Sequence, residues 1–393
     1  MNEENFIRFV LEHEGEDPAR LLLAADRWPE TDVRRAARTI TGRRKMREKV
    51  PAWLAYPALD YPSTLSLEQC SSEETARYKQ AFVPAGSRIA DLTGGLGVDS
   101  WALSQRAAET HYCERNPELC AAARHNFAIL GASIEVHEGD GIEWLRQQPE
   151  RFDLLYLDPT RRDKAARRVY DITDCEPDLL GIKDLLLSRA DRVLAKLSPM
   201  ADISRTLAQL PETRELHILG VDGEVKELLV LLEKQPIAAD ASGQSSPLIV
   251  AADGNIRFSF TPEEENAAEV RFAAAIGRYL LQPAKVLRKA GAFRLLSERF
   301  GIAKLAPSTH LYTADEPVVG FPGKCLAVEE VLPWGNAARR ELGRRFKRLE
   351  LTALNFPMTT DGLRKRLGIA AGGTRHVFAT SLNHEKVLII CKL

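Results

Sequence analysis

The sequence has neither the paired cysteines that stabilise small secreted proteins nor the long apolar runs of membrane proteins. Its six cysteines show no C-x-x-C pair and no regular spacing, so we expect free thiols, with neither a disulfide framework nor a metal site. No apolar run approaches the ~18 residues that a membrane span needs. The N-terminus is acidic and amphipathic and lacks the basic-then-apolar layout of a signal peptide. These absences predict a cytoplasmic protein with no membrane contact.

An overall excess of positive charge is also missing, but the charges are unevenly distributed. The 393 residues contain 54 Lys and Arg against 55 Asp and Glu, a net charge of −1. From Pro283 to Leu393 there are 19 basic and 9 acidic residues, a net charge of +10, and the 282 preceding residues carry −11. The sequence therefore predicts an acidic N-terminal part and a basic C-terminal part that could hold a polyanion.

The length predicts two or three domains at about 150 residues each. Residues 1–83 have helical spacing, and residues 84–236 alternate β-rich and helical runs five times, which is typical of a parallel doubly wound sheet. Two further β-rich runs flank Asp222-Gly223 and predict a hairpin that makes the last strand of the sheet antiparallel.

The C-terminal part has mixed patterns. Residues 237–319 are predicted to be a linker and a short α+β segment, with a hairpin around Asp253-Gly254 and a helix from Glu263 to Leu281. Residues 320–393 combine β-rich runs with two basic helical runs, and are predicted to form a separate basic domain.

A glycine-rich turn follows the first predicted strand and begins at Asp91. Such a turn lets the backbone approach a ligand closely and points the N–H groups of the next helix at it. Gly95 and Gly97 are followed by Ser100 where a dinucleotide site has its third glycine. The alternative is a turn that uses glycine for its geometry alone.

Two more acids end the next two predicted strands. Glu114 follows Asp91 by 23 residues, where a carboxylate can hold both hydroxyls of a ribose, and Asp140 is placed to accept from an adenine amine. Glu114 alone could be a solvated strand end. Three acids at successive strand ends instead predict a nucleoside site, because open α/β sheets bind ligands along that edge.

The fourth predicted strand ends in Asp158-Pro159-Thr160-Arg161-Arg162. This places a carboxylate and a rigid turn beside the expected reactive end of a bound cofactor. The alternative is a proline-terminated strand with a solvated acid. The basic run that follows is either a solvated charge run or a phosphate contact at the mouth of the site.

Together the motifs DLTGGLG, CERNP, EGDG and DPTRR resemble the class I S-adenosylmethionine-dependent methyltransferases. The stretches LSLEQCSSEETARYK, DLTGGLGVDS, DPTRRD, LRKAGAFRLLSERFGIAKLAPSTHLYT and FPG resemble a narrower bacterial family. That family has an N-terminal helical region, a methyltransferase core, a ferredoxin-like segment and a THUMP-like domain. The resemblance implies an α/β fold, with a doubly wound, seven-stranded, mostly parallel Rossmann-like sheet and a C-terminal α+β module.

The resemblance also implies roles for residues and a cofactor, S-adenosyl-L-methionine. Asp158 and Pro159 would lie beside the transferred methyl as the catalytic pair. The motif D-P-T-R lacks the aromatic ring common in enzymes that methylate exocyclic base amines, so the methylated atom stays open. The implied cofactor-binding residues are Asp91, Thr93, Gly95 and Gly97 at the methionine part, Glu114 at the ribose, and Asp140 and Gly141 at the adenine.

THUMP-containing proteins act on structured RNA, and the basic C-terminal runs have the charge for it. The predicted activity is therefore methylation of a base in tRNA or rRNA. A small-molecule or protein methyltransferase and a non-catalytic RNA-binding protein are the alternatives, and the basic helices could simply have solvated faces. The predicted RNA-binding residues are Arg161, Arg162, Arg344, Arg345, Arg348, Arg364 and Lys365.

Overall fold

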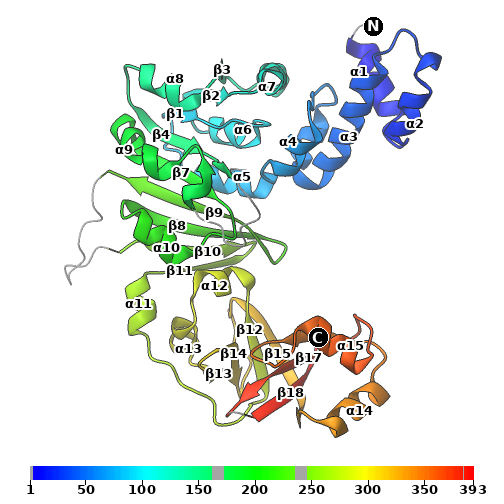
Figure 1. The fold of residues 1–393 in the computed structure, drawn as a ribbon, viewed down its shortest axis with the longest axis vertical. Helices are drawn as coiled ribbons and strands as arrows, with labels where there is room; N and C mark the ends of the chain where they lie inside the picture. Colours follow the sequence, from blue (N-terminus) through cyan, green and yellow to red (C-terminus); the bar gives the residue numbers. More distant parts are fainter. Residues whose placement is uncertain (1–2, 162–171, 235–245, 384) are drawn as a thin grey trace. The chain divides into compact units, whose positions relative to one another are not determined.

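A computed structural model describes residues 3–161, 172–234, 246–383 and 385–393. The chain forms two compact units, Met1–Leu216 with Glu227–Asp240, and His217–Lys226 with Ala241–Leu393. Each unit is described by itself, with element labels as in Figure 1. Among the described helices, none combines the length and the apolar character that a membrane crossing requires. The four-part division expected from the sequence stays a prediction.

The first unit begins with the predicted helical region. Asp32, Ser63 and Ser72 cap α3, α4 and α5, because each side chain accepts a hydrogen bond from a backbone N–H of the first turn. The first three helices pack on a small apolar core that includes Phe6 and Ile40. The helices are α1 (Glu3–Glu12), α2 (Pro18–Leu23), α3 (Val33–Lys49), α4 (Thr64–Gln69) and α5 (Glu73–Lys79).

A large sheet follows, with the predicted alternation of strands and helices. Within the described residues the strand order is β11-β10-β8-β9-β7-β4-β1-β2-β3. The strands are β1 (Arg88–Asp91), β2 (Glu109–Glu114), β3 (Glu135–Glu138), β4 (Phe152–Leu157), β7 (Ala190–Leu197), β8 (Thr213–Val221), β9 (Glu224–Glu233), β10 (Leu248–Asp253) and β11 (Ile256–Phe260). The helices are α6 (Val98–Ser104), α7 (Pro117–Ile129), α8 (Gly141–Gln147), α9 (Leu179–Arg189) and α10 (Ile203–Gln209).

The arrangement of the sheet confirms the predicted doubly wound fold. Strands β1, β2, β3, β4 and β7 are parallel, and β9 pairs with β7 in antiparallel orientation. The hairpin predicted around Asp253-Gly254 is present as β10 and β11. It continues the same sheet, so the described sheet has nine strands where the sequence predicted seven.

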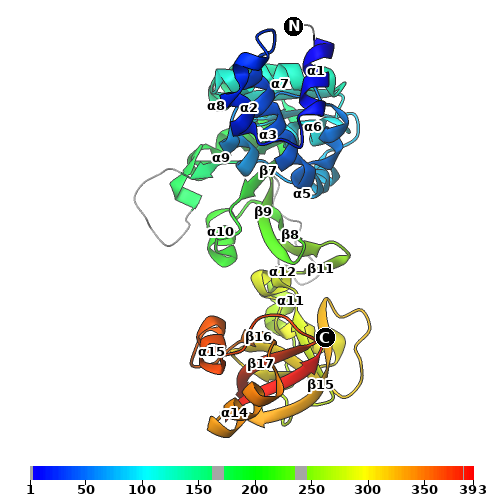
Figure 2. The ribbon, with the colours of Figure 1, turned by 90° about the vertical axis from the view of Figure 1, so that its right-hand side faces the viewer.

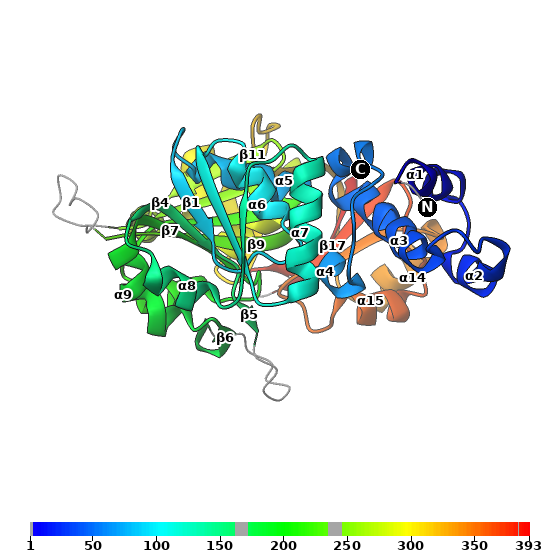
Figure 3. The same cartoon turned by 90° about the horizontal axis from the view of Figure 1, so that it is seen from above.

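Helices cover both faces of the parallel strands. Tyr112 of β2 packs on Phe127 of α7, and its neighbour His111, on the opposite face, packs on Trp144 of α8. Figure 3 shows α6 and α7 on one side of β1 and β4, and α8 and α9 on the other. Because all five parallel strands end at one edge, the loops after β1, β2, β3 and β4 meet there.

A ribbon of two short strands, β5 (Thr160–Arg161) and β6 (Cys175–Glu176), lies beyond β4. Arg162 of the predicted basic run lies outside the described residues, as does the side chain of Arg161.

The C-terminal part of the second unit contains another mixed sheet. Its described strand order is β13-β14-β12-β15-β18-β17-β16. The strands are β12 (Tyr279–Pro283), β13 (Ala303–Ala306), β14 (Thr309–Ala314), β15 (Gly323–Pro333), β16 (Glu350–Ala353), β17 (Arg375–Leu382) and β18 (Glu385–Lys392). The helices are α11 (Pro262–Ala267), α12 (Lys285–Ala290), α13 (Arg294–Phe300), α14 (Asn336–Arg345) and α15 (Thr360–Leu367). Figure 2 shows α14 and α15 beside β16 and β17.

The helix predicted from Glu263 to Leu281 is wrong. Only Pro262–Ala267 is helical, and Tyr279–Pro283 is strand β12, paired on both sides with β14 and β15. The alanine-rich sequence favours a helix locally, but Leu280 and Leu281 are fully buried as part of the sheet. Tertiary pairing outweighs the small differences in helix propensity between residues.

Candidate active site

A cleft of about 760 Å³ lies at the carboxyl edge of the parallel strands. The loops after β1 and β2, the start of α8 and the end of β4 contribute its walls. Pro159 is buried next to it. The cleft brings together the sequence-predicted residues Asp91, Thr93, Gly95, Gly97, Glu114, Asp140, Gly141 and Asp158.

The Asp91 carboxylate accepts hydrogen bonds from residues on both sides of the glycine-rich loop. One carboxylate oxygen accepts a hydrogen bond from the Thr93 N–H at 3.0 Å, and the other accepts from the Ser100 hydroxyl at 2.5 Å. Burial raises the pKa of the Asp91 carboxyl to about 7, against the opposing effect of these two hydrogen bonds. The structure therefore shows Asp91 shaping the loop, whereas its contact with a cofactor stays a prediction.

Two glycines leave the backbone no room for a side chain. Gly97 has φ of +85°, and a Cβ there would lie 2.7 Å from Cζ of Phe127. A Cβ on Gly141 would lie 2.3 Å from the carbonyl oxygen of Leu92. Glycine is thus required at both positions for the loops after β1 and β3 to pack as they do.

Backbone donors hold the carboxylates at the ends of β2 and β3. Glu114 accepts from the N–H groups of Gly95 at 2.9 Å and Asn116 at 2.8 Å. Asp140 caps α8 by accepting from the N–H of Ile142 at 2.7 Å, and it contacts Arg115. Both acids are oriented before any ligand arrives.

The pKa of Asp140 follows from these contacts. Burial pushes this pKa up, but hydrogen bonds from the Glu143 and Ile142 N–H groups and the charge of Arg115 outweigh burial and lower it. Asp140 therefore stays ionised at neutral pH and can accept a further hydrogen bond.

Asp158 is held by a lysine that sequence analysis missed. Nζ of Lys196, on β7, lies 2.5 Å from Oδ2 of Asp158, and the Asp158 N–H donates to Oγ1 of Thr93 at 2.6 Å. Burial pushes the pKa of Lys196 down, but Asp158, Asp99 and Glu227 together raise it above its usual value. Lys196 is therefore charged and fixes the Asp158 carboxylate at the edge of the cleft.

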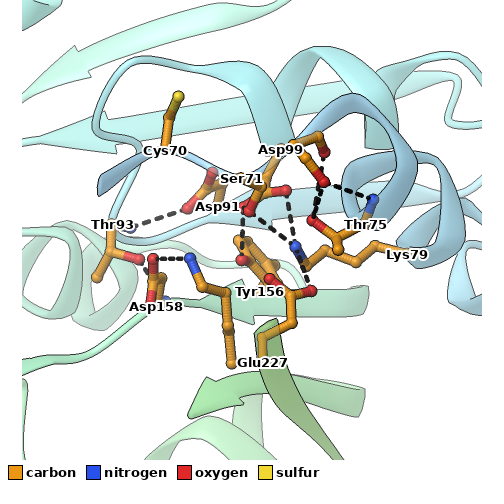
Figure 4. Close-up of polar contacts among 12 residues, drawn as sticks. Cys70, Ser71, Thr75, Lys79, Asp91, Thr93, Asp99, Tyr156, Asp158 and Glu227 are labelled. Atoms are coloured by element: carbon orange, nitrogen blue, oxygen red, sulfur yellow. Dashed lines mark hydrogen bonds and ion pairs between the residues drawn. The ribbon is translucent and has the colours of Figure 1, made fainter. Parts of the chain in front are cut away.

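A buried ion-pair network borders the cleft (Figure 4), and its members Ser71, Asp99 and Tyr156 line the cleft. Nζ of Lys79, on α5, lies 2.9 Å from Oδ1 of Asp99 and 2.8 Å from Oε1 of Glu227. Ser71 and Tyr156 donate to Oδ2 of Asp99 at 2.8 and 2.7 Å. Burial pushes the pKa of Asp99 up, but Lys79 and Lys196 lower it below its usual value.

The network joins the helical region to the large sheet, because Lys79 of α5 contacts Glu227 of β9. Ser71, Lys79 and Asp99 lie in stretches that resemble the family, which gave them no role. Lys196 in RVLAKLS and Glu227 in KELLVLLEK are charges in largely apolar strands. Helical periodicity did not indicate that Lys79 is buried, because a lysine on an amphipathic helix normally faces solvent. The helical region also lines the cleft directly, with Ser63, Leu65, Ser66, Gln69, Cys70 and Ser71.

The predicted RNA-binding residues of the second unit differ in their surroundings. Arg344, Arg348 and Lys365 are exposed. Arg345 contacts Glu330 at 2.5 Å, and Arg364 donates to the carbonyl of Leu349 at 3.1 Å. Arg344 also lies 3.9 Å from Glu341, although its side chain is 80% exposed. Three of the five therefore contact other groups of the protein, while Arg344, Arg348 and Lys365 remain accessible to solvent.

Comparisons with known proteins agree with this architecture. A family model described as a ferredoxin-like domain matches residues 279–322, and one described as THUMP domain-like matches residues 323–393. A crystal structure named "putative methyltransferase from Porphyromonas gingivalis W83" is 35% identical with a TM-score of 0.87, covering 99% of this chain and 97% of that chain.

Two curated relatives match parts of the chain. An "uncharacterized S-adenosylmethionine-dependent methyltransferase" of Mycobacterium tuberculosis (strain ATCC 25618 / H37Rv) is 23% identical over 250 residues, 64% of each protein. Ribosomal RNA small subunit methyltransferase J of Marinobacter nauticus is 32% identical over 91 residues, 20% of this chain and 33% of that protein. The matched region thus spans less than two thirds of these relatives. With the fold and the near full-length match to the Porphyromonas protein, the chain belongs to the family of class I S-adenosylmethionine-dependent methyltransferases with a C-terminal ferredoxin-like segment and THUMP-like domain.

Proposed function

We propose that the protein transfers a methyl group from S-adenosyl-L-methionine to a base in structured RNA, either tRNA or rRNA. One observation carries the proposal. The glycine loop, Glu114, Asp140 and Asp158, from four successive strand ends, line a single cleft. Open α/β sheets bind nucleoside ligands along this edge.

The residues present fit the cofactor. The cleft volume of about 760 Å³ falls within the range of small-molecule sites. Glu114 and Asp140 offer carboxylate oxygens to the ribose hydroxyls and the adenine amine, and Gly97 keeps the backbone close. The acidic lining also suits a sulfonium cation. When bound, S-adenosyl-L-methionine supplies an electrophilic methyl group.

The chain's own contribution is orientation. Asp158 accepts a hydrogen bond from the target base, while Lys196 holds the carboxylate by its other oxygen and Thr93 fixes its backbone. Pro159 makes the turn rigid. A bound and aligned target gains most of its rate from proximity, so no strong acid or base is needed.

The thiols of the cleft argue against a covalent cysteine mechanism. Cys70 and Cys113 both line the cleft. Burial raises the pKa of each thiol above its usual value. The thiolate is the nucleophile, so neither cysteine is activated at neutral pH. Direct transfer is the mechanism that these residues support.

The RNA part of the proposal rests on the second unit and the relatives. Arg344, Arg348 and Lys365 are exposed within the match to the THUMP-like model. Such a surface binds phosphates without reading sequence, and the target base must leave its stack to enter a cleft. Ribosomal RNA small subunit methyltransferase J, one of the partial relatives, is an rRNA methyltransferase by name.

The first experiment is calorimetric titration of the full chain with S-adenosyl-L-methionine. We expect binding, and a clear loss of affinity in Glu114→Ala. Glu118→Ala is the matched control, because Glu118 is exposed on the neighbouring helix α7. If the wild type does not bind, or if the two variants bind alike, the protein is not a methyltransferase of this design, and a non-catalytic RNA-binding protein becomes the better explanation.

The second experiment is mass spectrometry of RNA nucleosides from cells with and without the protein. We expect one methylated nucleoside to disappear, and to return with wild type or Asp184→Ala but not with Asp158→Ala. Asp184 is an exposed acid on α9 and serves as the control. An unchanged nucleoside profile, with intact cofactor binding, would favour a small-molecule or protein substrate.

A further inference from the structure

Two histidines and a glutamate converge on strands β2 and β3, outside the cleft. Nδ1 of His111 lies 3.0 Å from Nε2 of His137. Carboxylate oxygens of Glu135 lie 3.5 Å from His111 Nδ1 and 3.7 Å from His137 Nε2. The parallel register places His111 opposite Glu135, and His137 follows two residues later on the same face. All three potential ligand atoms lie within 4.8 Å of one another.

The spacing of these atoms matches a small divalent metal ion. Zn²⁺ binds histidine nitrogen and carboxylate oxygen at roughly 2.0–2.2 Å in a tetrahedral arrangement. Ligand atoms on such an ion lie about 3.3–3.5 Å apart. The two nitrogens lie 3.0 Å apart, and each lies 3.5 or 3.7 Å from a different oxygen of the Glu135 carboxylate, which is close to that value.

A second carboxylate prepares His111 for this role. Oε1 of Glu109 lies 2.6 Å from His111 Nε2 and 2.9 Å from Nε of Arg88. The Nε2–H therefore donates to Glu109, and the Nδ1 lone pair faces the cluster. A carboxylate behind the distal nitrogen of a metal-ligating histidine is the usual arrangement in metal sites.

The surroundings close one side of the cluster and open the other. The ring of Trp144, on α8, lies 4.6 Å from the His137 ring and 5.2 Å from the His111 ring. The His111 side chain is 6% exposed, whereas that of Glu135 is 67% exposed. An ion can thus enter from solvent on the Glu135 side.

We propose that His111 Nδ1, His137 Nε2 and Glu135 form a binding site for a divalent transition metal, with Zn²⁺ as the best match and water completing the coordination. None of the three lines the cleft, so the site is structural. It would tie the edge strand β3 to β2 beneath α8. This proposal is independent of the proposed methyltransferase activity. The expectation of no metal site rested on cysteine spacing, and these ligands lie too far apart in sequence to form a recognisable motif.

The test is calorimetric titration of the chelator-treated full chain with ZnCl₂, and with MgCl₂ as the hard-cation control. We expect one Zn²⁺ per chain and no Mg²⁺ binding, because nitrogen donors select against Mg²⁺. His137→Ala should abolish binding and Glu135→Gln should weaken it at least tenfold. Glu109→Gln should weaken it by about 10- to 100-fold, as outer-shell substitutions do.

Two other substitutions serve as matched controls. His13→Ala removes a histidine that contacts only one carboxylate in this way, Glu16 at 2.8 Å. Glu138→Gln removes a neighbouring acid of β3 near Arg124. Both should bind Zn²⁺ like wild type. If wild type binds no stoichiometric Zn²⁺, or if Glu135→Gln and His137→Ala bind it as tightly as the controls, the proposal is wrong. Glu135→Gln decides the matter even if His137→Ala does not fold, because Glu135 is exposed.

Discussion

Replacing the buried Lys79 by methionine tests how the helical region is held to the rest of the first unit. The Lys79 side chain is fully buried and contacts two carboxylates, those of Asp99 and Glu227, which are 10% and 4% exposed. Methionine preserves the bulk of the lysine stem but removes the charge. Both acids then remain buried without their ion-pair partner, and the charge of Lys196 still acts on them.

The expected cost follows from this geometry. Breaking a buried ion pair from one side costs about 3–5 kcal/mol, because the remaining charge has lost both water and its partner. Two acids lose this partner but Lys196 remains, so we expect a cost within that range at pH 7. The cost should shrink at lower pH, where Asp99 and Glu227 can be neutralised by protonation.

Urea unfolding followed by tryptophan fluorescence measures this effect. Trp28, Trp53, Trp101 and Trp144 lie in the first unit, so the signal reports mainly on that unit. Lys45→Met is the matched control. Lys45 makes a similar ion pair with Glu68 at 2.6 Å, but these side chains are 33% and 61% exposed. Water screens such a pair, so its loss should change the stability far less than the loss of Lys79 does.

The double variant Lys79→Met with Glu227→Gln refines the result. Removing one of the two stranded charges should recover part of the lost stability, and a double-mutant cycle gives the coupling between the two residues. If Lys79→Met costs no more than Lys45→Met, the network does not hold the helical region in place and our reasoning is refuted.

Three further predictions concern the loop and the basic surface. The Asp91 carboxyl has a pKa of about 7 in the folded protein and about 3.9 in the unfolded chain, so the free energy of unfolding should fall as pH rises from 4 to 7. Asp91→Asn does not titrate, and its free energy of unfolding should therefore rise relative to that of the wild type by up to about 4 kcal/mol over that range. Parallel curves of stability against pH would contradict this. Gly97→Ala should weaken S-adenosyl-L-methionine binding, measured by calorimetry, because its Cβ would lie 2.7 Å from a phenylalanine ring. Gly131→Ala is the control: Gly131 has a similar positive φ but nothing within 4 Å, so this variant should lose stability in urea unfolding and keep its cofactor affinity. Arg344→Glu with Lys365→Glu should weaken RNA binding and reduce the slope of log K against log salt by about 1–2, with cofactor affinity unchanged; an unaltered slope would place the RNA elsewhere.

The sequence predicted most of the fold because local patterns repeat. Five strand–helix alternations and the Asp222-Gly223 turn are properties of neighbouring residues, and they appear as expected in the described structure. The failed helix from Glu263 to Leu281 shows the limit. Its alanine content favours a helix, but pairing with β14 and β15, strands that lie later in the chain, decided otherwise.

The acidic residues of the site were predicted from the sequence, but the residues that hold them in place were not. Asp91, Glu114, Asp140 and Asp158 could be placed together because parallel strands end at one edge. Nothing local indicates that Lys196 would reach Asp158 across 38 residues.

By itself, then, the sequence determined the doubly wound sheet, the acidic residues at one edge of it and the basic C-terminal part, because periodicity, turn residues and charge are local quantities. Only the tertiary structure decided which charges are buried together, such as Lys79 with Glu227, and which donors converge, such as His111 with His137. Burial and donor spacing depend on residues that are distant in the chain, and these two properties set the pKa values of the site and the proposed metal site.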